Sequence, residues 1–291
     1  MGTPRVMIFD LLRILAICLI LICHIGTPIL SPLLNYQWDA WIGNIFYLNL
    51  GSIGVILFIV ISGAVLELNK PKITDATSYL KFQGKRLLRL YPAYWMSLLF
   101  AIMLYLYAGK KDFGNLLLQF SGFSAFVNQW GGNLNSVSWC IGLLVVLYLL
   151  YPFISCAINS KPYTAIACLL IISISSIFFL NTWAMATNIP LGYLISRWFP
   201  LCNLIWFGLG IFIVNKSWYP KTADTTGITL YLGELSFYVF LFHCPILVIA
   251  QTSIPVFLAY TLGLAMIAMM VDNRIHDFLK KLPVVLPLRS D

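Results

Sequence analysis

The sequence predicts an all-α fold, a polytopic membrane helix bundle of 8–10 transmembrane helices. Of its 291 residues, 60% are hydrophobic and only 10% are charged, with a mean hydropathy of +0.89. Soluble domains carry roughly 25% charged residues. Apolar runs long enough to cross a hydrocarbon core of about 30 Å recur along the chain. The net charge of +8 fits basic cytoplasmic loops beside anionic lipid, so we expect lipids and no nucleic acid as partners.

Eight apolar runs are expected to cross the membrane. They are residues 7–25, 48–67, 91–108, 137–157, 163–180, 199–215, 228–250 and 254–271. Two further stretches, 29–47 and 113–129, are aromatic-rich or short. Because Trp and Tyr favour the headgroup level, both stretches could be interfacial or re-entrant helices.

Charge predicts the orientation of the bundle. With eight spans and an inner N-terminus, 14 of the 18 Lys and Arg residues fall inside and three outside. This bias favours N- and C-termini in the cytoplasm. We expect one membrane domain over residues 1–271 and a basic cytoplasmic tail over 272–291.

The seven cysteines lie mostly inside apolar runs and form no CxxC pair. We interpret them as small buried hydrophobic residues and expect neither a disulfide nor a metal site. The first apolar run follows Arg5 and resembles a signal peptide. Asp10 and Arg13 interrupt it and no cleavage site follows, so we interpret it as the first span.

That first span, FDLLRILAICLILICH over residues 9–24, carries Asp10, Arg13 and His24. Ionisable groups inside a membrane helix are costly and indicate function. Eleven residues separate Arg13 from His24, which places both on one helical face about 16 Å apart along the axis. Asp10 is three residues before Arg13 and can pair with it.

His24 could be an interfacial histidine bonded to a carbonyl. Because it shares a face with Arg13 and the chain has only two other histidines, we favour a functional role. A neutral imidazole is the usual general base for a hydroxyl.

A basic stretch, KFQGKRLLRLYPAYW over residues 81–95, places Arg86 and Arg89 on one helical face with Lys85 beside them. On these residues alone, a juxtamembrane cluster that fixes topology is the simpler interpretation. The functional interpretation is a phosphate clamp, because arginine binds phosphate through two parallel hydrogen bonds. Pro92 is expected in the first turn of the following span.

Three other regions have structural explanations that suffice by spacing alone. Ser62 lies in a glycine-rich span typical of close helix packing, without an adjacent base. Trp139 and Tyr148 fit an aromatic belt. His243 lies at a depth similar to that of His24, so it is either a second polar group near the same cavity or a buried structural histidine.

Several of these motifs together resemble the membrane-bound acyltransferase 3 family. Arg13 and His24 match its first-span hallmark, and the other matching runs follow in the family's order over nearly the whole chain. These runs are Phe58 to Gly63, Lys85 to Trp95 (KRxxRxxPxYW), Trp139 with Tyr148 and Pro152, and Gly233 to His243 (GxxSxxxxLxH).

One position departs from the family pattern. Many members carry a glutamate five residues after the tryptophan of the third run, where this chain has Leu144. The chain is therefore more similar to a glutamate-less branch, the O-acetyltransferases of enterobacterial common antigen and related exopolysaccharides. The substitution puts any glutamate-assisted step in doubt.

The resemblance implies an O-acetyltransferase of the bacterial inner membrane. Cytosolic acetyl-CoA, a donor and not a resident cofactor, would bind through Lys85, Arg86 and Arg89. Its thioester would pass Arg13, paired with Asp10, and reach His24, which would act as base or transient acyl carrier. The acceptor would be a lipid-linked or exported glycan, and the remaining motif residues would belong to substrate binding. These are Ser62, Trp139, Tyr148 and His243.

Two other classes of function remain open at this point. A glycan or acyl transporter, or a flippase of an exopolysaccharide pathway, would also suit a charged first helix. A membrane sensor or scaffold is the third class, and the absence of acetyl-CoA binding would favour it.

Overall fold

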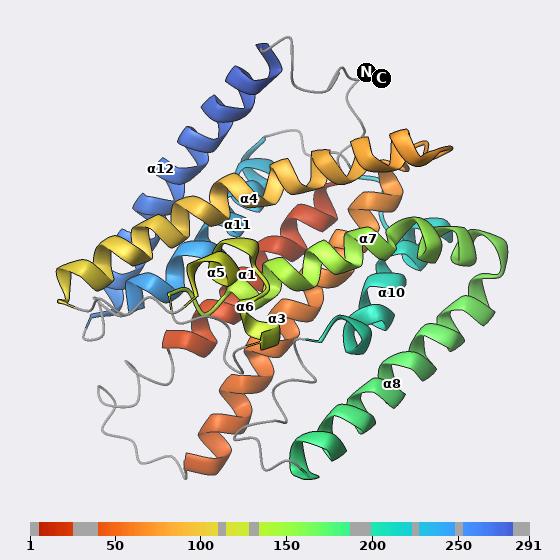
Figure 1. The fold of residues 1–291 in the computed structure, drawn as a ribbon, viewed down its shortest axis with the longest axis horizontal. Helices are drawn as coiled ribbons and strands as arrows, with labels where there is room; N and C mark the ends of the chain where they lie inside the picture. Colours follow the sequence, from red (N-terminus) through yellow and green to blue (C-terminus); the bar gives the residue numbers. More distant parts are fainter. Residues whose placement is uncertain are drawn as a thin grey trace.

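A computed structural model describes residues 6–25, 40–109, 115–127, 134–186, 199–222, 227–247 and 253–281, and throughout these ranges the regular secondary structure is helical (Figure 1). Seven helices are long and apolar enough to cross a membrane, and a shorter apolar segment, Pro200–Asn215, joins them. The all-α membrane bundle is thereby confirmed, while the orientation of its termini stays a prediction. The seven helices are α1 (Met7–Ile25), α3 (Ala40–Leu68), α4 (Ala76–Tyr107), α7 (Ser138–Ser160), α8 (Pro162–Ala186), α11 (Ile228–Leu247) and α12 (Ile254–Lys281).

The two ambiguous stretches have different outcomes. Helix α3 already begins at Ala40, so the second half of 29–47 is helical, whereas residues 29–39 lie outside the described part. Within 113–129, the described residues form two short helices, α5 (Leu116–Ser121) and α6 (Ser124–Val127). Gly122 ends α5 with a φ of 78°, a conformation that glycine adopts readily. Neither helix is long enough to cross a bilayer.

Helix α4 is longer than the sequence predicts. Asp75 caps its N-terminus by accepting a 2.7 Å hydrogen bond from the backbone N–H of Ser78, and this bond lowers the pKa of the Asp75 carboxyl. Pro92 lies in the interior of α4, so the prediction of a first-turn proline is wrong. Membrane helices tolerate interior prolines because neighbouring groups satisfy the freed carbonyl. The basic stretch and the following span are consequently one continuous helix.

Helix α1 lies at the centre of the bundle and packs against α3 and α11 (Figure 1). Helix α10 (Leu204–Asn215), preceded by the 3-10 helix η3 (Pro200–Asn203), packs against α3. Small residues permit this approach, because a Cβ atom added to Gly210 would lie 1.9 Å from the carbonyl oxygen of Val60. Helix α8 stands at the edge of the bundle and is its least buried span.

A buried carboxylate joins α3 to α7 near the C-terminal end of α3. Glu67 accepts hydrogen bonds from Tyr151 (3.0 Å), Ser155 (2.6 Å) and Asn159 (2.9 Å) of α7. Lys70 adds an ion pair at 3.2 Å. Because each donor comes from a different turn of α7, the two helices are fixed in register here.

Helix α12 continues beyond residue 271 to Lys281 without a break. The first part of the expected basic tail is therefore the end of the last long helix. Residues 282–291, with Pro283 and Pro287, lie outside the described part.

Candidate functional site

A cavity of about 420 Å³ lies among α1, α3, α4, α7, α11 and α12. It collects six of the residues that the sequence analysis proposed from four separate regions of the chain. These are Arg13, Ser62, Lys85, Arg86, Arg89 and Tyr148. The helical packing therefore joins the first-span arginine to the basic face of α4.

Arg13 is held at the cavity wall by the predicted partner. Its Nη1 donates to Asp10 Oδ1 at 2.5 Å, and both side chains are largely buried. Asp10 in turn faces α11, where a Cβ atom added to Gly233 would lie 2.8 Å from the Asp10 carboxylate oxygen. A side chain at position 233 would push α11 away from this ion pair, so glycine permits the close contact.

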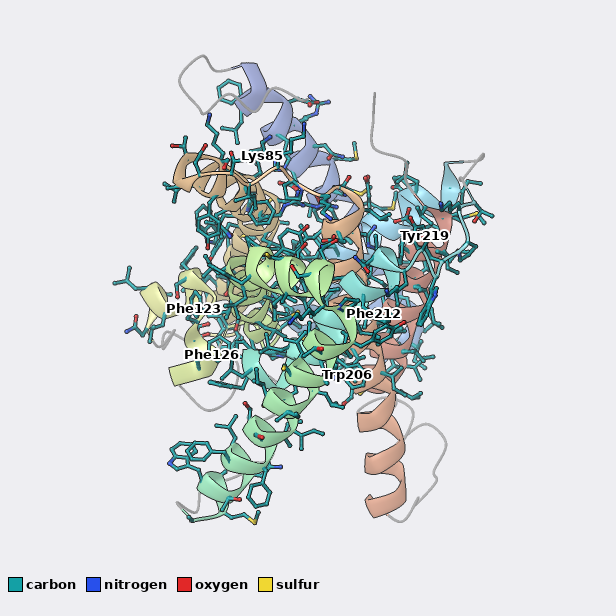
Figure 2. The ribbon with its side chains drawn as sticks, turned by 90° about the vertical axis from the view of Figure 1, so that its right-hand side faces the viewer. Lys85, Phe123, Phe126, Trp206, Phe212 and Tyr219 are labelled. Atoms are coloured by element: carbon teal, nitrogen blue, oxygen red, sulfur yellow. The ribbon has the colours of Figure 1, made fainter. Side chains whose placement is uncertain are left out.

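The basic side chains of α4 line one end of the cavity. Arg86 lies with its guanidinium carbon 5.5 Å from the centre of the Phe82 ring, and its buried Nε has no hydrogen-bond partner. Figure 2 shows Lys85 toward the same end of the molecule as Tyr219, whereas Trp206 lies toward the other end. This end of the cavity can receive an anion.

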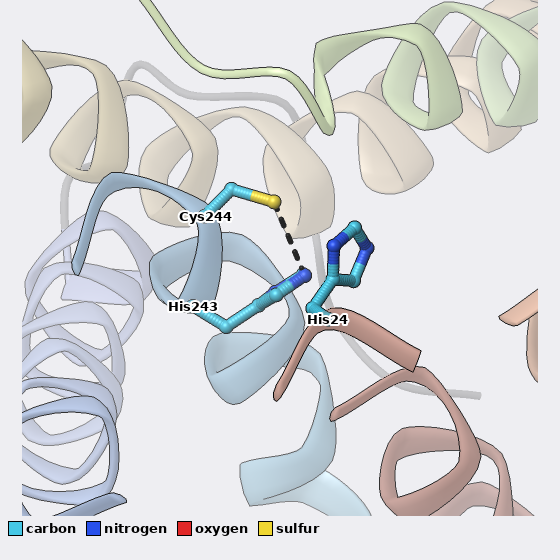
Figure 3. A group of neighbouring side chains, drawn as sticks. All are labelled: His24, His243 and Cys244. Atoms are coloured by element: carbon cyan, nitrogen blue, oxygen red, sulfur yellow. Dashed lines mark hydrogen bonds between the residues drawn. The ribbon is translucent and has the colours of Figure 1, made fainter. Parts of the chain in front are cut away.

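His24 and His243 meet at the far ends of α1 and α11. Their ring centres are 4.9 Å apart, and His243 is fully buried. His243 Nδ1 lies 2.7 Å from the carbonyl oxygen of Phe240 and its Nε2 lies 3.2 Å from Cys244 Sγ. Figure 3 shows the three side chains pointing toward one another. His24 therefore faces α11, and Arg13 lines a cavity to which α11 also contributes.

Four of the proposed residues do not line the cavity: Asp10, His24, Trp139 and His243. His24 is connected to it through side chains of α11, because the His243 ring packs 5.8 Å from the ring of Phe240, a lining residue. Phe240 itself packs 5.8 Å from Phe58, which also lines the cavity. The described cavity therefore ends one aromatic layer short of the two histidines.

The opposite wall carries a polar group that was not predicted from the sequence. Asp272 of α12 is 3% exposed and accepts a 2.5 Å hydrogen bond from Tyr238 through Oδ2. Its Oδ1 has no hydrogen-bond partner, although His276 Nδ1 lies 3.9 Å away. All three residues line the cavity. The signal in the sequence was a carboxylate immediately after the last apolar run.

Leu144 is buried and lines the cavity. The wall is therefore apolar at the position where many family members carry a glutamate. Among the lining residues, the carboxylates are Glu234 and Asp272. The arrangement supplies cations at one end, an apolar passage, and an imidazole pair beyond it.

Comparison with known proteins identifies a family. The model of the acyltransferase 3 family, described as an acyltransferase domain, matches residues 8–228. This range contains α3, α4, α7, α8, α10 and all but the first residue of α1, and these helices supply just over half of the residues that line the cavity. No curated protein and no solved structure matches the chain.

Proposed function

Because the chain belongs to the acyltransferase 3 family and is a multi-pass membrane acyltransferase, we propose that it transfers an acetyl group from cytosolic acetyl-CoA to a hydroxyl of a lipid-linked or exported glycan. The observation that carries this proposal is the cavity in which Arg13 of α1 meets Lys85, Arg86 and Arg89 of α4. A bacterial inner membrane is the location that this function implies.

The basic end of the cavity supports a phosphate-bearing donor. Arg86 and Arg89 stand on adjacent turns of one rigid helix, and arginine pairs with phosphate in a planar, two-bonded geometry. The donor is a transient substrate, so no resident cofactor is required. Its pantetheine arm would extend past Arg13, between Tyr148 and Ser62, toward the apolar part of the cavity.

We assign Ser62 to the shape of the cavity wall and not to nucleophilic attack on the thioester. Its hydroxyl donates a 2.8 Å hydrogen bond to the carbonyl oxygen of Phe58, four residues earlier. A hydroxyl committed to its own helix is a poor nucleophile without an adjacent base. We assign Ser62, Tyr148, Trp139 and His243 to substrate binding or to positioning of the groups around it.

The transfer itself is assigned to His24. One imidazole nitrogen removes the proton of the acceptor hydroxyl, whose oxygen attacks the thioester carbonyl. The carbon–sulfur bond breaks, the acetyl ester forms, and the departing CoA thiolate takes the proton from the imidazolium. His24 could instead carry the acetyl group transiently between donor and acceptor. In either route the Phe58–Phe240 pair must move aside, because the described cavity ends there.

Purified protein with labelled acetyl-CoA and a lipid-linked glycan acceptor tests the proposal. His24→Ala and Arg13→Ala should each abolish transfer, while both variants still insert, since removing an ionisable group from a span lowers its insertion cost. The double variant Asp10→Ala/Arg13→Ala removes the buried carboxylate together with its partner and should be equally inactive. His276→Ala, which changes a histidine at the other end of the cavity, is the matched control and should retain transfer.

Full activity in both His24→Ala and Arg13→Ala would refute the site. If the wild-type protein transported the glycan but consumed no acetyl-CoA, a transporter would replace the acyltransferase as the function. If it bound no acetyl-CoA, a sensor or scaffold would be the better assignment.

A further inference from the structure

We propose that His24, His243 and Cys244 form a binding site for a soft or borderline transition-metal ion, of which Zn²⁺ and Cu⁺ are the common examples. One potential ligand atom from each side chain lies within 4.8 Å of the other two. Figure 3 shows all three converging from the facing ends of α1 and α11. The similar depth of His24 and His243 was visible in the sequence, but the approach of Cys244 to His24 depends on helix packing. The proposed site replaces the expectation that the cysteines hold no metal.

The donor set is suited to such an ion. Imidazole nitrogen and thiolate sulfur are the ligands that Zn²⁺ and Cu⁺ prefer, whereas Mg²⁺ and Ca²⁺ require oxygen. Three protein ligands with one open position is the arrangement found in catalytic zinc sites. The two carboxylates that line the cavity, Glu234 and Asp272, are not members of this group, so its nitrogen and sulfur donors favour a softer ion.

The distances require little movement. A tetrahedral zinc ion with bonds of about 2.0–2.3 Å separates its ligand atoms by roughly 3.3–3.6 Å. Cys244 Sγ and His243 Nε2 are 3.2 Å apart, close to that separation. The three ligand atoms all lie within 4.8 Å of one another. A shift of about 1 Å in the His24 nitrogen, produced by side-chain rotation, would therefore bring it to the separation that zinc requires.

The hydrogen bond that His243 makes to the backbone also fits a ligand role. Its Nδ1 lies 2.7 Å from the Phe240 carbonyl oxygen, which can only accept, so this nitrogen carries the proton. The lone pair is therefore on Nε2, directed at Cys244. Metal-binding histidines characteristically donate their other N–H to a carbonyl or carboxylate in this way.

Metal binding would control the acyltransferase, a consequence that rests on the proposed function. An ion that takes the lone pair of His24 leaves no base for the acceptor hydroxyl. The bound metal would therefore inhibit acetyl transfer, and removing Cys244 would relieve the inhibition. The binding itself does not depend on the proposed function.

Cobalt provides a direct test. The full-length protein is purified in detergent, stripped of metal and titrated with Co²⁺. A thiolate-to-cobalt charge-transfer band reports the sulfur ligand, and the d–d bands report tetrahedral coordination. Wild type should bind one equivalent and release it to Zn²⁺. Cys244→Ser should lose the charge-transfer band and raise the dissociation constant at least tenfold. Competition between the protein and a Cu⁺ chelator distinguishes a copper site from a zinc site.

Cys156→Ser is the matched control, because Cys156 is an exposed cysteine on α7, and it should leave the cobalt spectrum unchanged. Equal melting temperatures of the two variants verify folding. Absence of the charge-transfer band in wild type, or its persistence in Cys244→Ser, would overturn the site.

The activity measurement separates this site from the proposed function. Zn²⁺ should inhibit wild-type transfer, and Cys244→Ser should keep basal transfer but need at least tenfold more Zn²⁺ for inhibition. A cobalt spectrum without any acetyl transfer would retain the metal site and reject the acetyltransferase. Acetyl transfer without a cobalt spectrum would reject the metal site and retain the acetyltransferase.

Discussion

Replacing Arg86 with alanine should raise the KM for acetyl-CoA about 10- to 150-fold and leave kcat nearly unchanged. The guanidinium lines the cavity over the Phe82 ring, and its buried Nε has no partner. Among the described residues no carboxylate pairs with it, so truncation breaks no ion pair within the protein. The loss is then the charged hydrogen bonds to the donor, about 1.5–3 kcal/mol, where about 1.4 kcal/mol is a factor of ten.

Steady-state kinetics with varied acetyl-CoA and saturating acceptor measure this effect. Lys216→Ala is the matched control, because Lys216 also stands over an aromatic ring, Tyr163 at 5.0 Å, but does not line the cavity. Arg86→Lys should recover part of the loss, since it keeps the charge and not the planar donors. An unchanged KM for acetyl-CoA, or a change confined to the acceptor, would refute the phosphate-binding role.

Three further predictions concern packing and the opposite wall of the cavity. Glu67→Ala should lower the free energy of unfolding by about 3 kcal/mol, because buried donors of α7 lose their acceptor. Thermal unfolding in detergent measures this loss, and an unchanged melting temperature would contradict the role of the Glu67 hydrogen bonds. Gly210→Ala should also lower the melting temperature, since its Cβ would meet Val60, whereas Gly263→Ala, with open space around it, should not. Asp272→Ala should lower the melting temperature, because the buried Tyr238 hydroxyl loses its acceptor, and a melting temperature equal to that of wild type would argue against this hydrogen bond.

The sequence predicted the class of fold because lipid imposes a simple requirement. Every span must be about 20 apolar residues long and internally hydrogen-bonded, so the order of the long helices could be inferred directly. The length of α4 could not. Pro92 is a strong local signal for a helix start, and only the surrounding bundle shows that α4 continues through it.

The parts of the candidate site that could be predicted are those formed by neighbouring residues of a single helix. Asp10 and Arg13 pair over three residues of α1, and Arg86 and Arg89 share a face of α4. Contacts between helices carry no such periodic signal. The approach of His243 to His24 depends on the packing of α1 against α11, and a single carboxylate at the end of an apolar run did not identify Asp272 as part of the cavity.

The hydrogen-bonded Glu67 also constrains how a large donor reaches the cavity. Because Glu67 holds α3 to α7 at the basic end, those two helices cannot separate to widen the opening without breaking several buried bonds. The remaining sides of that end are formed by α4, α11 and α12, which carry Arg86, Glu234 and His276. One route that stays open runs between the amino-terminal half of α4 and the carboxy-terminal half of α12. Cross-linking those two halves tests it, because donor binding should be lost while the rest of the bundle stays intact.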